Sequence, residues 1–176
     1  MNITICGGGN LGHVCAGFLA NRGHKVTILT TKPSSWAKTL EIVAPDGDFT
    51  GVLTTVTSEP AEAIPNAEVV LVCLPGFAIR SELEKIKLHL TKSNVVGTVV
   101  SSTGFFFEAF NVLPPDTALF GFQRVPFISR TIDYGRRAEL KGYKETLSVV
   151  VENIDSKEPI RLMLEKLFEK PVMLLD

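Results

Sequence analysis

Apolar residues along this chain recur first as short unbroken runs and then at helical spacing, and the two patterns alternate. Residues 2–6 have the pattern of a buried strand, and residues 10–22 then carry apolar positions at helical spacing as far as Gly23. Residues 25–29 alternate and then become continuously apolar, which predicts a second strand. Because the interval between the two strands is that of a βαβ unit, we expect them to be parallel.

The segment after the second predicted strand interrupts this alternation. Residues 40–56 contain two strand-like runs around the turn sequence Pro45-Asp46-Gly47-Asp48. Turn residues between two such runs predict an antiparallel β-hairpin. We therefore expect a hairpin inserted after the second strand.

Strand and helix patterns then resume. Apolar runs predict strands at 68–74, 94–102 and 117–123. Residues 81–90 predict an amphipathic helix. In that helix we expect Leu83, Ile86 and Leu90 to face inward and Glu82, Lys85 and His89 to face outward.

The last third of the chain changes in character. Beyond Gln123 it is rich in β-branched and polar residues, with a clear strand pattern at 144–152 and a helix with a broad apolar stripe at 159–168 that includes Leu162. Alternating strands and helices with right-handed crossovers predict an α/β fold. We expect one domain over residues 1–176: a doubly wound, mostly parallel Rossmann sheet with the inserted hairpin and some antiparallel strands near the C-terminus.

Composition narrows the class of protein. The 176 residues are 45% hydrophobic and 21% charged, and no apolar run approaches the roughly 20 residues of a membrane-spanning helix. The formal charge of −1 argues against nucleic acid as a partner. The three cysteines, Cys6, Cys15 and Cys73, lack zinc-site spacing and fit a reducing cytoplasm. No targeting segment is recognisable, so we expect a cytoplasmic protein without a membrane or nucleic-acid partner.

A glycine cluster joins the first predicted strand to the first predicted helix. It reads Gly7-Gly8-Gly9-Asn10-Leu11-Gly12 and fits G-x-G-x-x-G, the pattern that binds dinucleotides in this context. Gly7 would make the tight turn, Gly9 would let the backbone approach a pyrophosphate, and Gly12 would let the helix pack closely. Gly8, Asn10 and Leu11 would supply backbone donors at the helix N-terminus. A glycine-rich turn without a ligand is the alternative.

The end of the second predicted strand bears on the choice of coenzyme. Its sequence is Leu29-Thr30-Thr31-Lys32, without the carboxylate that commonly binds the adenosine ribose about 20 residues after the motif. Two hydroxyls and a cation suit a 2′-phosphate better than a bare diol. The sequence therefore favours NADP over NAD, with a solvated loop charge at Lys32 as the alternative.

Two loops after later strands are expected to complete the site, because ligands of open α/β sheets bind beyond the carboxyl ends of the strands. The residues expected to contribute are Leu74, Pro75, Gly76 and Ala78 from the first loop and Ser102 and Thr103 from the second. The hydroxyls of the second loop could reach the ribose or carboxamide of a nicotinamide, and Phe105 could cover a ring face. Ordinary strand-to-helix turn chemistry is the alternative.

Other reactive side chains are expected to be structural. His13, His24 and His89 have no neighbours in sequence that indicate a triad or a metal site. Cys6 and Cys73 end two predicted strands and are expected to be buried small hydrophobic residues.

Four motifs carry a resemblance to known proteins: GGGNLGH, LANRGHKVTI, LPGFA and GFQRVPFISRTIDYGRRAELKGYKETLSVVVE. The first motifs are generic to dinucleotide binders, and the last, which contains Tyr134 and Gly135, is the more specific part. Together they resemble the nucleotide-binding domain of the octopine/nopaline (opine) dehydrogenases, and more distantly ketopantoate reductases and glycerol-3-phosphate dehydrogenases. The resemblance covers nearly the whole chain. It implies a nicotinamide coenzyme and the reductive coupling of an amino acid to a 2-keto acid.

The resemblance also implies a missing part. The catalytic histidine and aspartate of that family belong to a second, helical domain, and this sequence ends at Asp176 before any such domain. We expect the coenzyme half of an oxidoreductase, inactive alone and with no catalytic residue of its own. Its uncovered apolar face could pair two chains into a homodimer.

Two other functions stay open. One is an NAD(P)-sensing regulatory module that uses residues 40–56 and the tail after Gln123 as interaction surfaces. The other is the coenzyme domain of a ketopantoate-reductase-like 2-keto acid reductase. A natural gene that continues past Asp176 into a helical domain with a histidine would favour an enzyme.

Overall fold

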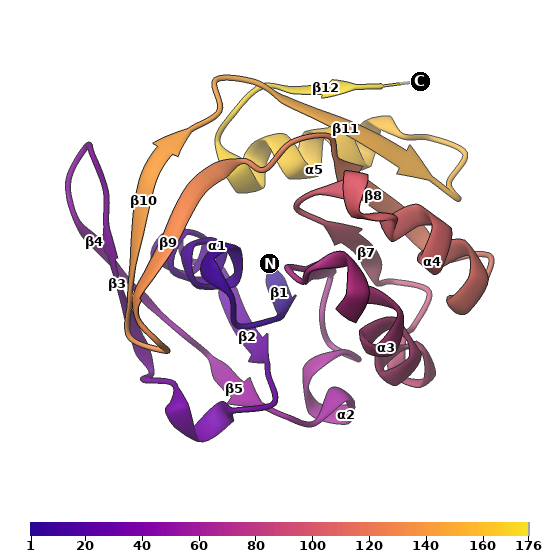
Figure 1. Ribbon diagram of the computed structural model, residues 1–176. Coiled ribbons are helices and arrows are strands. Elements are labelled where there is room, and N and C mark those ends of the chain that lie inside the picture. The colour runs from indigo at the N-terminus through magenta and orange to yellow at the C-terminus, as the bar shows by residue number, and fades with distance from the viewer. Residues whose placement is uncertain (176) are drawn as a thin grey trace.

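Within residues 1–175, which the computed structural model describes apart from the side chain of Thr103, the strands form an eight-stranded main sheet and a four-stranded smaller sheet (Figure 1). The strands of the main sheet are β1 (Asn2–Cys6), β2 (Lys25–Leu29), β5 (Thr55–Thr57), β6 (Val69–Val72), β7 (Val95–Thr98), β8 (Ala118–Phe122), β11 (Leu147–Glu152) and β12 (Val172–Leu174). Their order is β12-β11-β8-β7-β6-β1-β2-β5. Pairing is parallel from β5 to β8, and β11 is antiparallel to β8. The predicted fold class is confirmed.

The order of the strands reverses at β1. From β1 the chain adds β2 and β5 on one side and then returns to add β6, β7 and β8 on the other. β1 and β6 are buried on both faces over most of their length, as their continuous apolar runs require. The glycine cluster follows β1, so it lies at the point where an open α/β sheet forms its ligand crevice.

Helices cover both faces of the main sheet. They are α1 (Asn10–Asn21), α2 (Pro60–Ala63), α3 (Gly76–Ile86), α4 (Phe105–Val112) and α5 (Glu158–Phe168), with short 3₁₀ turns η1 (Pro33–Ser35), η2 (Lys87–His89) and η3 (Ser101–Thr103). One core cluster contains side chains of α1 and α5, and the other contains side chains of α2, α3 and α4. The main sheet separates these two clusters.

The smaller sheet packs against α1, on the side away from the main sheet (Figure 1). Its order is β4 (Phe49–Val52), β3 (Thr39–Val43), β10 (Arg137–Tyr143) and β9 (Phe127–Asp133). Contact is close, because a Cβ atom on Gly51 would collide with the carbonyl oxygen of Gly17 in α1. Covered on both sides, α1 is buried continuously from Gly12 to Leu19.

The hairpin predicted at 40–56 is confirmed in part. β3 and β4 pair antiparallel. Residues 55–57 instead form β5, which pairs in parallel with β2, because Thr54 N–H donates to the Val26 carbonyl (2.8 Å) and starts a new ladder. The hairpin also leaves the main sheet, since β3 pairs in parallel with β10.

Three predictions about individual side chains are wrong. The helix predicted at 81–90 begins at Gly76, and the side chain of Glu82 is only 13% exposed rather than facing solvent. Leu162, expected in the apolar stripe of α5, is 51% exposed because the helix packs over a narrower face. Phe105 is completely buried in the cluster with α3, so its ring cannot cover a ligand.

Candidate functional site

The glycine loop between β1 and α1 has the backbone that its sequence predicts. Gly7 has a φ of +114°, a left-handed conformation that side chains disfavour, and its N–H donates to the Leu29 carbonyl at the end of β2 (3.1 Å). A Cβ atom on Gly7 would lie 2.7 Å from the Cys73 carbonyl oxygen. Gly7 is therefore held at the junction of three strands, where only glycine fits.

The other glycines of the motif differ in their surroundings. A Cβ atom on Gly12 would collide with the Gly7 carbonyl oxygen, so this glycine allows α1 to approach β1. A Cβ atom on Gly9 would meet nothing within 4 Å. Gly9 is the N-cap of α1, and no side chain caps the helix there. The first backbone N–H groups of α1 are therefore not capped by a side chain, which makes this helix N-terminus suitable for an anion.

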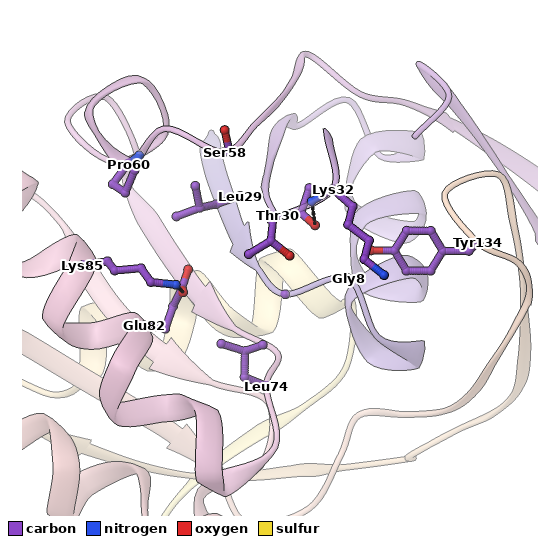
Figure 2. A pocket seen from close by; sticks show the side chains of 12 residues that line it. Gly8, Leu29, Thr30, Lys32, Ser58, Pro60, Leu74, Glu82, Lys85 and Tyr134 are labelled. Carbon is purple, nitrogen blue, oxygen red and sulfur yellow. Dashed lines mark hydrogen bonds and ion pairs between the residues drawn. The ribbon is translucent and has the colours of Figure 1, made fainter. Parts of the chain in front are cut away.

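A pocket of about 170 Å³, termed the β2 pocket, opens on one side of this loop (Figure 2). Its lining residues are Gly7, Gly8, Leu29, Thr30, Thr31, Lys32, Ser58, Pro60, Leu74, Glu82, Lys85 and Tyr134. Figure 2 shows Thr30 and Lys32 on one wall and Glu82 and Lys85 on the opposite wall. The pocket is mostly polar at the end of β2 and carries charge of both signs.

A larger pocket of about 490 Å³, termed the β7 pocket, opens on the other side of the loop. Its lining residues are Gly9, Asn10, Leu11, Cys73, Leu74, Pro75, Val99, Val100, Val125, Phe127, Ile128 and Ser129. These side chains are mostly apolar, and none of those described carries a charge. Leu74 borders both pockets, so the two cavities are neighbours, and with the loop they are termed the crevice.

The structure gathers most of the predicted site residues around this crevice. Those that line a pocket are Gly7, Gly8, Gly9, Asn10, Leu11, Thr30, Thr31, Lys32, Leu74 and Pro75. Gly12, Gly76, Ala78 and Ser102 line neither pocket, and Gly76 begins α3. Thr103 belongs to η3, but its side chain lies outside the described part of the chain.

Several lining residues were missed by sequence reasoning. Glu82 and Lys85 are predicted on a solvated helix face, and both line the β2 pocket. Lys85 is 53% exposed, as expected, whereas Glu82 is only 13% exposed. Phe127 and Ser129 come from β9 of the smaller sheet. Tyr134 follows β9, in the turn before β10. No local pattern reports which distant strand covers the loop. The sequence signal for Phe127, Ser129 and Tyr134 is that they fall in the longest motif of the family resemblance.

His13 connects the glycine loop to the smaller sheet. Its Nδ1 donates to the Gly9 carbonyl (2.9 Å), and its Nε2 accepts from the N–H of Gly135 (2.7 Å), which requires the neutral Nδ1–H form. The ring stacks on Trp36, with centroids 4.3 Å apart. Burial lowers the pKa of His13, opposed by the bond to Gly9, and so favours the neutral form. The structural role expected for this histidine is confirmed.

Asn10 makes a second connection between the same two regions. Its Oδ1 accepts a hydrogen bond from the N–H of Thr131 in β9 (2.8 Å). The first turn of α1 is therefore tied to β9 by a side chain that itself lines the β7 pocket.

Charged groups of the β2 pocket are arranged asymmetrically. Glu82 and Lys85 form an ion pair (3.3 Å) on the wall formed by α3. Lys32 on the other wall is exposed, and its backbone N–H donates to the Thr30 hydroxyl (3.3 Å). The end of β2 thus carries a cation and hydroxyls, without a carboxylate at residues 30–32.

The cysteines are buried, as predicted. Burial raises the pKa of the Cys6 thiol, and a hydrogen bond with Cys15, followed by burial, raises that of Cys73. Thiols with raised pKa values are poor nucleophiles. Across the described residues no cluster of His, Cys, Asp and Glu is able to hold a metal ion, and no described helix has the length and apolar character to cross a membrane.

Comparisons with known proteins agree with this geometry. The opine dehydrogenase of Haliotis discus hannai is 28% identical over 84% of this chain and 41% of its own length. The uncharacterized protein y4xO of Sinorhizobium fredii is 31% identical over 99% of this chain and 50% of its own length. A solved octopine dehydrogenase in complex with NADH and agmatine superposes with a TM-score of 0.86 at 24% identity, over 99% of this chain and 48% of that one.

These matches show which family the chain belongs to and how much of its relatives' length it covers. This chain spans about half the length of the curated relatives that it matches. The resemblance to opine dehydrogenases and ketopantoate reductases is confirmed. The family described as ketopantoate reductase PanE/ApbA matches residues 3–104, more than half of the 176 residues. The chain therefore belongs to the PanE/ApbA ketopantoate reductase family.

Proposed function

We propose that this chain is the nicotinamide-dinucleotide-binding part of an opine-dehydrogenase-like oxidoreductase and that it has no turnover alone. The observation that carries the proposal is the glycine loop between two pockets of different character. We infer that the adenosine end of the coenzyme occupies the β2 pocket, which has charged side chains, and the nicotinamide occupies the apolar β7 pocket. The pyrophosphate would then cross the loop at Gly9, where there is room for it.

In this proposal the chain's own residues bind and orient the coenzyme. Backbone N–H groups at the start of α1 neutralise phosphate charge, and the Asn10 side chain holds that turn against β9. Apolar side chains such as Val99 and Phe127 exclude water from the nicotinamide. When bound, a reduced nicotinamide supplies a hydride, the chemistry that belongs to the coenzyme.

The remaining chemistry is assigned to a part of the protein beyond these residues. A 2-keto acid and an amino acid carry carboxylates, and reducing the imine between them requires a positioned proton donor. None of the described side chains that line the β7 pocket is charged. We infer that a second, helical domain supplies the proton donor and the substrate pocket. The greater length of the relatives supports this inference.

For the coenzyme itself we propose NADP ahead of NAD. Lys32, Thr30 and Thr31 lie together in the β2 pocket and suit a 2′-phosphate. Glu82 is the carboxylate of that pocket, and its pairing with Lys85 offsets its charge.

Binding can be tested with the single tryptophan of the chain. Trp36 lies beside the glycine loop, with its Cζ2 3.1 Å from a Cβ atom built on Gly8. NADH and NADPH absorb where tryptophan emits, so either should quench Trp36 on binding. We expect NADPH to bind more tightly, and Lys32→Ala to raise its Kd about tenfold while changing the Kd of NADH by less than about twofold.

Two results would contradict this proposal. Absence of quenching and of calorimetric heat with both coenzymes would exclude coenzyme binding. NADH binding as tight as or tighter than NADPH binding would exclude the preference for NADP. Lys92→Ala is a matched control, because Lys92 is also exposed but lies outside both pockets.

A second candidate function is a ketopantoate-reductase-like 2-keto acid reductase, which the family match supports. The two functions differ in whether an amine is required. The full-length protein should oxidise NADPH with a 2-keto acid only when an amino acid is present if it is opine-dehydrogenase-like. If the natural gene ends at residue 176, a nucleotide-sensing module becomes the better proposal.

A homodimer and a cytoplasmic location stay predictions.

A further inference from the structure

The turn between β9 and β10 brings one tyrosine onto the glycine loop. A Cβ atom built on Gly8 would lie 2.5 Å from the Tyr134 hydroxyl oxygen and 3.3 Å from its Cζ. In Figure 2 the hydroxyl side of the Tyr134 ring faces the loop. This side chain comes from the smaller sheet, outside the strands and helices that carry the glycine motif.

The turn that carries Tyr134 is held firmly. The N–H of Gly135 donates to His13 Nε2 (2.7 Å), and the Gly135 carbonyl accepts from the N–H of Ala37 (2.9 Å). Gly135 has a φ of +74°, and a Cβ atom there would collide with the Ser35 carbonyl oxygen, so only glycine fits this turn. Because Gly135 is held in place, the backbone of the adjacent Tyr134 has little freedom to move away from the loop.

The ring of Tyr134 is also packed on one side. Its edge meets His13, with centroids 5.1 Å apart, and Trp36, with centroids 5.7 Å apart. The residue is still 39% exposed and lines the β2 pocket. Among the described contacts of Tyr134 there is no hydrogen bond, so the hydroxyl keeps a free donor next to the helix N-terminus.

We propose that the Tyr134 hydroxyl donates a hydrogen bond to a phosphate oxygen of the bound nucleotide, on its adenosine side. This inference rests on the proposed function for the site and adds a contact that the glycine motif does not contain. The ligand chemistry is that of a nucleoside diphosphate, whose anionic oxygens are strong acceptors. The smaller sheet would then form a second wall of the phosphate site, opposite the backbone N–H groups of α1.

A purely structural role for Tyr134 makes a different prediction. The ring contacts with His13 and Trp36 involve only the aromatic ring. Tyr134→Phe keeps that ring and removes only the hydroxyl, so packing alone would leave nucleotide affinity unchanged. Tyr143→Phe is the matched control, because Tyr143 is the only other tyrosine and lines neither pocket.

The experiment measures dissociation constants of NADH by Trp36 quenching, and of ADP and adenosine by competition with NADH and by calorimetry. We expect Tyr134→Phe to raise the Kd of NADH and of ADP about tenfold, with adenosine unchanged. Tyr143→Phe should change none of them. A change below about twofold for NADH and ADP in Tyr134→Phe, or an equal loss for adenosine, would overturn the proposal.

A second measurement does not depend on the folding of Tyr134→Phe. In the Tyr143→Phe variant Tyr134 is the only tyrosine, so nitration by tetranitromethane reports on it alone. ADP should slow this nitration and adenosine should not; equal rates with and without ADP would contradict the proposal. If the wild-type chain binds ADP but neither NADH nor NADPH, the proposed function fails while the Tyr134 contact is still judged with ADP. If it binds no nucleotide at all, both are wrong.

Discussion

The main sheet and the smaller sheet approach the same crevice but are built from different kinds of sequence information. The glycine loop joins β1 to α1 within a few residues, and its conformation depends on Gly7 and Gly12, where a Cβ atom would collide with backbone. The smaller sheet joins residues 39–52 to residues 127–143, which are far apart in the chain. One region is specified locally, and the other only by long-range pairing.

The two regions also contribute different groups to the site. The loop presents backbone groups that any nucleotide phosphate could use. The smaller sheet holds that loop through His13 and Asn10 and adds Tyr134 to the β2 pocket and Phe127 to the β7 pocket. The smaller sheet therefore supports the loop and supplies side chains to both of the pockets beside it.

The largest expected effect comes from the side chain that joins the two sheets. Phe18 of α1 is 1% exposed and contacts Phe127 of β9 (centroids 4.8 Å apart) and Phe49, the first residue of β4. Phe18→Ala should cost about 3–5 kcal/mol of unfolding free energy because it leaves a cavity at this junction. Urea unfolding measures the loss, and hydrogen exchange should show the amides of β9 and β10 losing protection first.

Phe105→Ala is the matched control for this prediction. Phe105 is equally buried, but it belongs to the core cluster on the other face of the main sheet. Its loss should be of similar size without selective exchange in β9 and β10. If both variants expose the same amides equally, the smaller sheet is not a separate unit of stability.

A smaller effect is expected from His13, which should make the attachment of the smaller sheet sensitive to pH. The folded protein lowers the pKa of His13 from its ordinary value of 6.5, mainly through burial. The unfolded chain therefore takes up a proton first as the pH falls. Stability from this group is complete above pH 6.5 and is lost as the pH falls from there through the lower folded-state pKa.

Measured stability should respond accordingly. His13→Gln should flatten the loss of unfolding free energy between pH 7 and pH 5 and cost about 1–2 kcal/mol at neutral pH, since Gly135 loses its partner. His24→Gln is the control: its pKa is also lowered, mainly by burial, but it lies away from the loop. Only His13→Gln should weaken NADH binding; equal weakening by both variants would show that the effect is general destabilisation.

The smallest effect is expected at the surface of the smaller sheet. Arg137 of β10 pairs with Glu41 of β3 at 3.8 Å, with side-chain exposures of 48% and 66%. Arg137→Gln should change the unfolding free energy by no more than about 0.5 kcal/mol, because exposed ion pairs are screened by water. Thermal unfolding measures this. A loss above about 1 kcal/mol would mean that charge, rather than the apolar face toward α1, holds β3 to β10.

The sequence predicted the fold well where the signal was periodic. The strands at 2–6 and 25–29, their parallel pairing and the helix between them are confirmed. Prediction was weaker where exposure depended on tertiary contacts. Glu82 is predicted to face solvent because the pattern at 81–90 does not show that the glycine loop and the end of β2 lie beside this part of the helix. The site residues of the loop and of β2 gather as expected, while their roles stay predictions.

By itself the sequence determined the β1-loop-α1 unit and the βαβ order, because steric limits on glycine and hydrophobic periodicity act over a few residues. Only the tertiary structure decided what faces the loop. Tyr134 reaches Gly8 because β10 pairs with β3 and its turn bonds to His13, contacts between segments separated by most of the chain. Such contacts depend on the packing of the whole fold and leave no local pattern, so the second wall of the crevice could not be read from the order of residues.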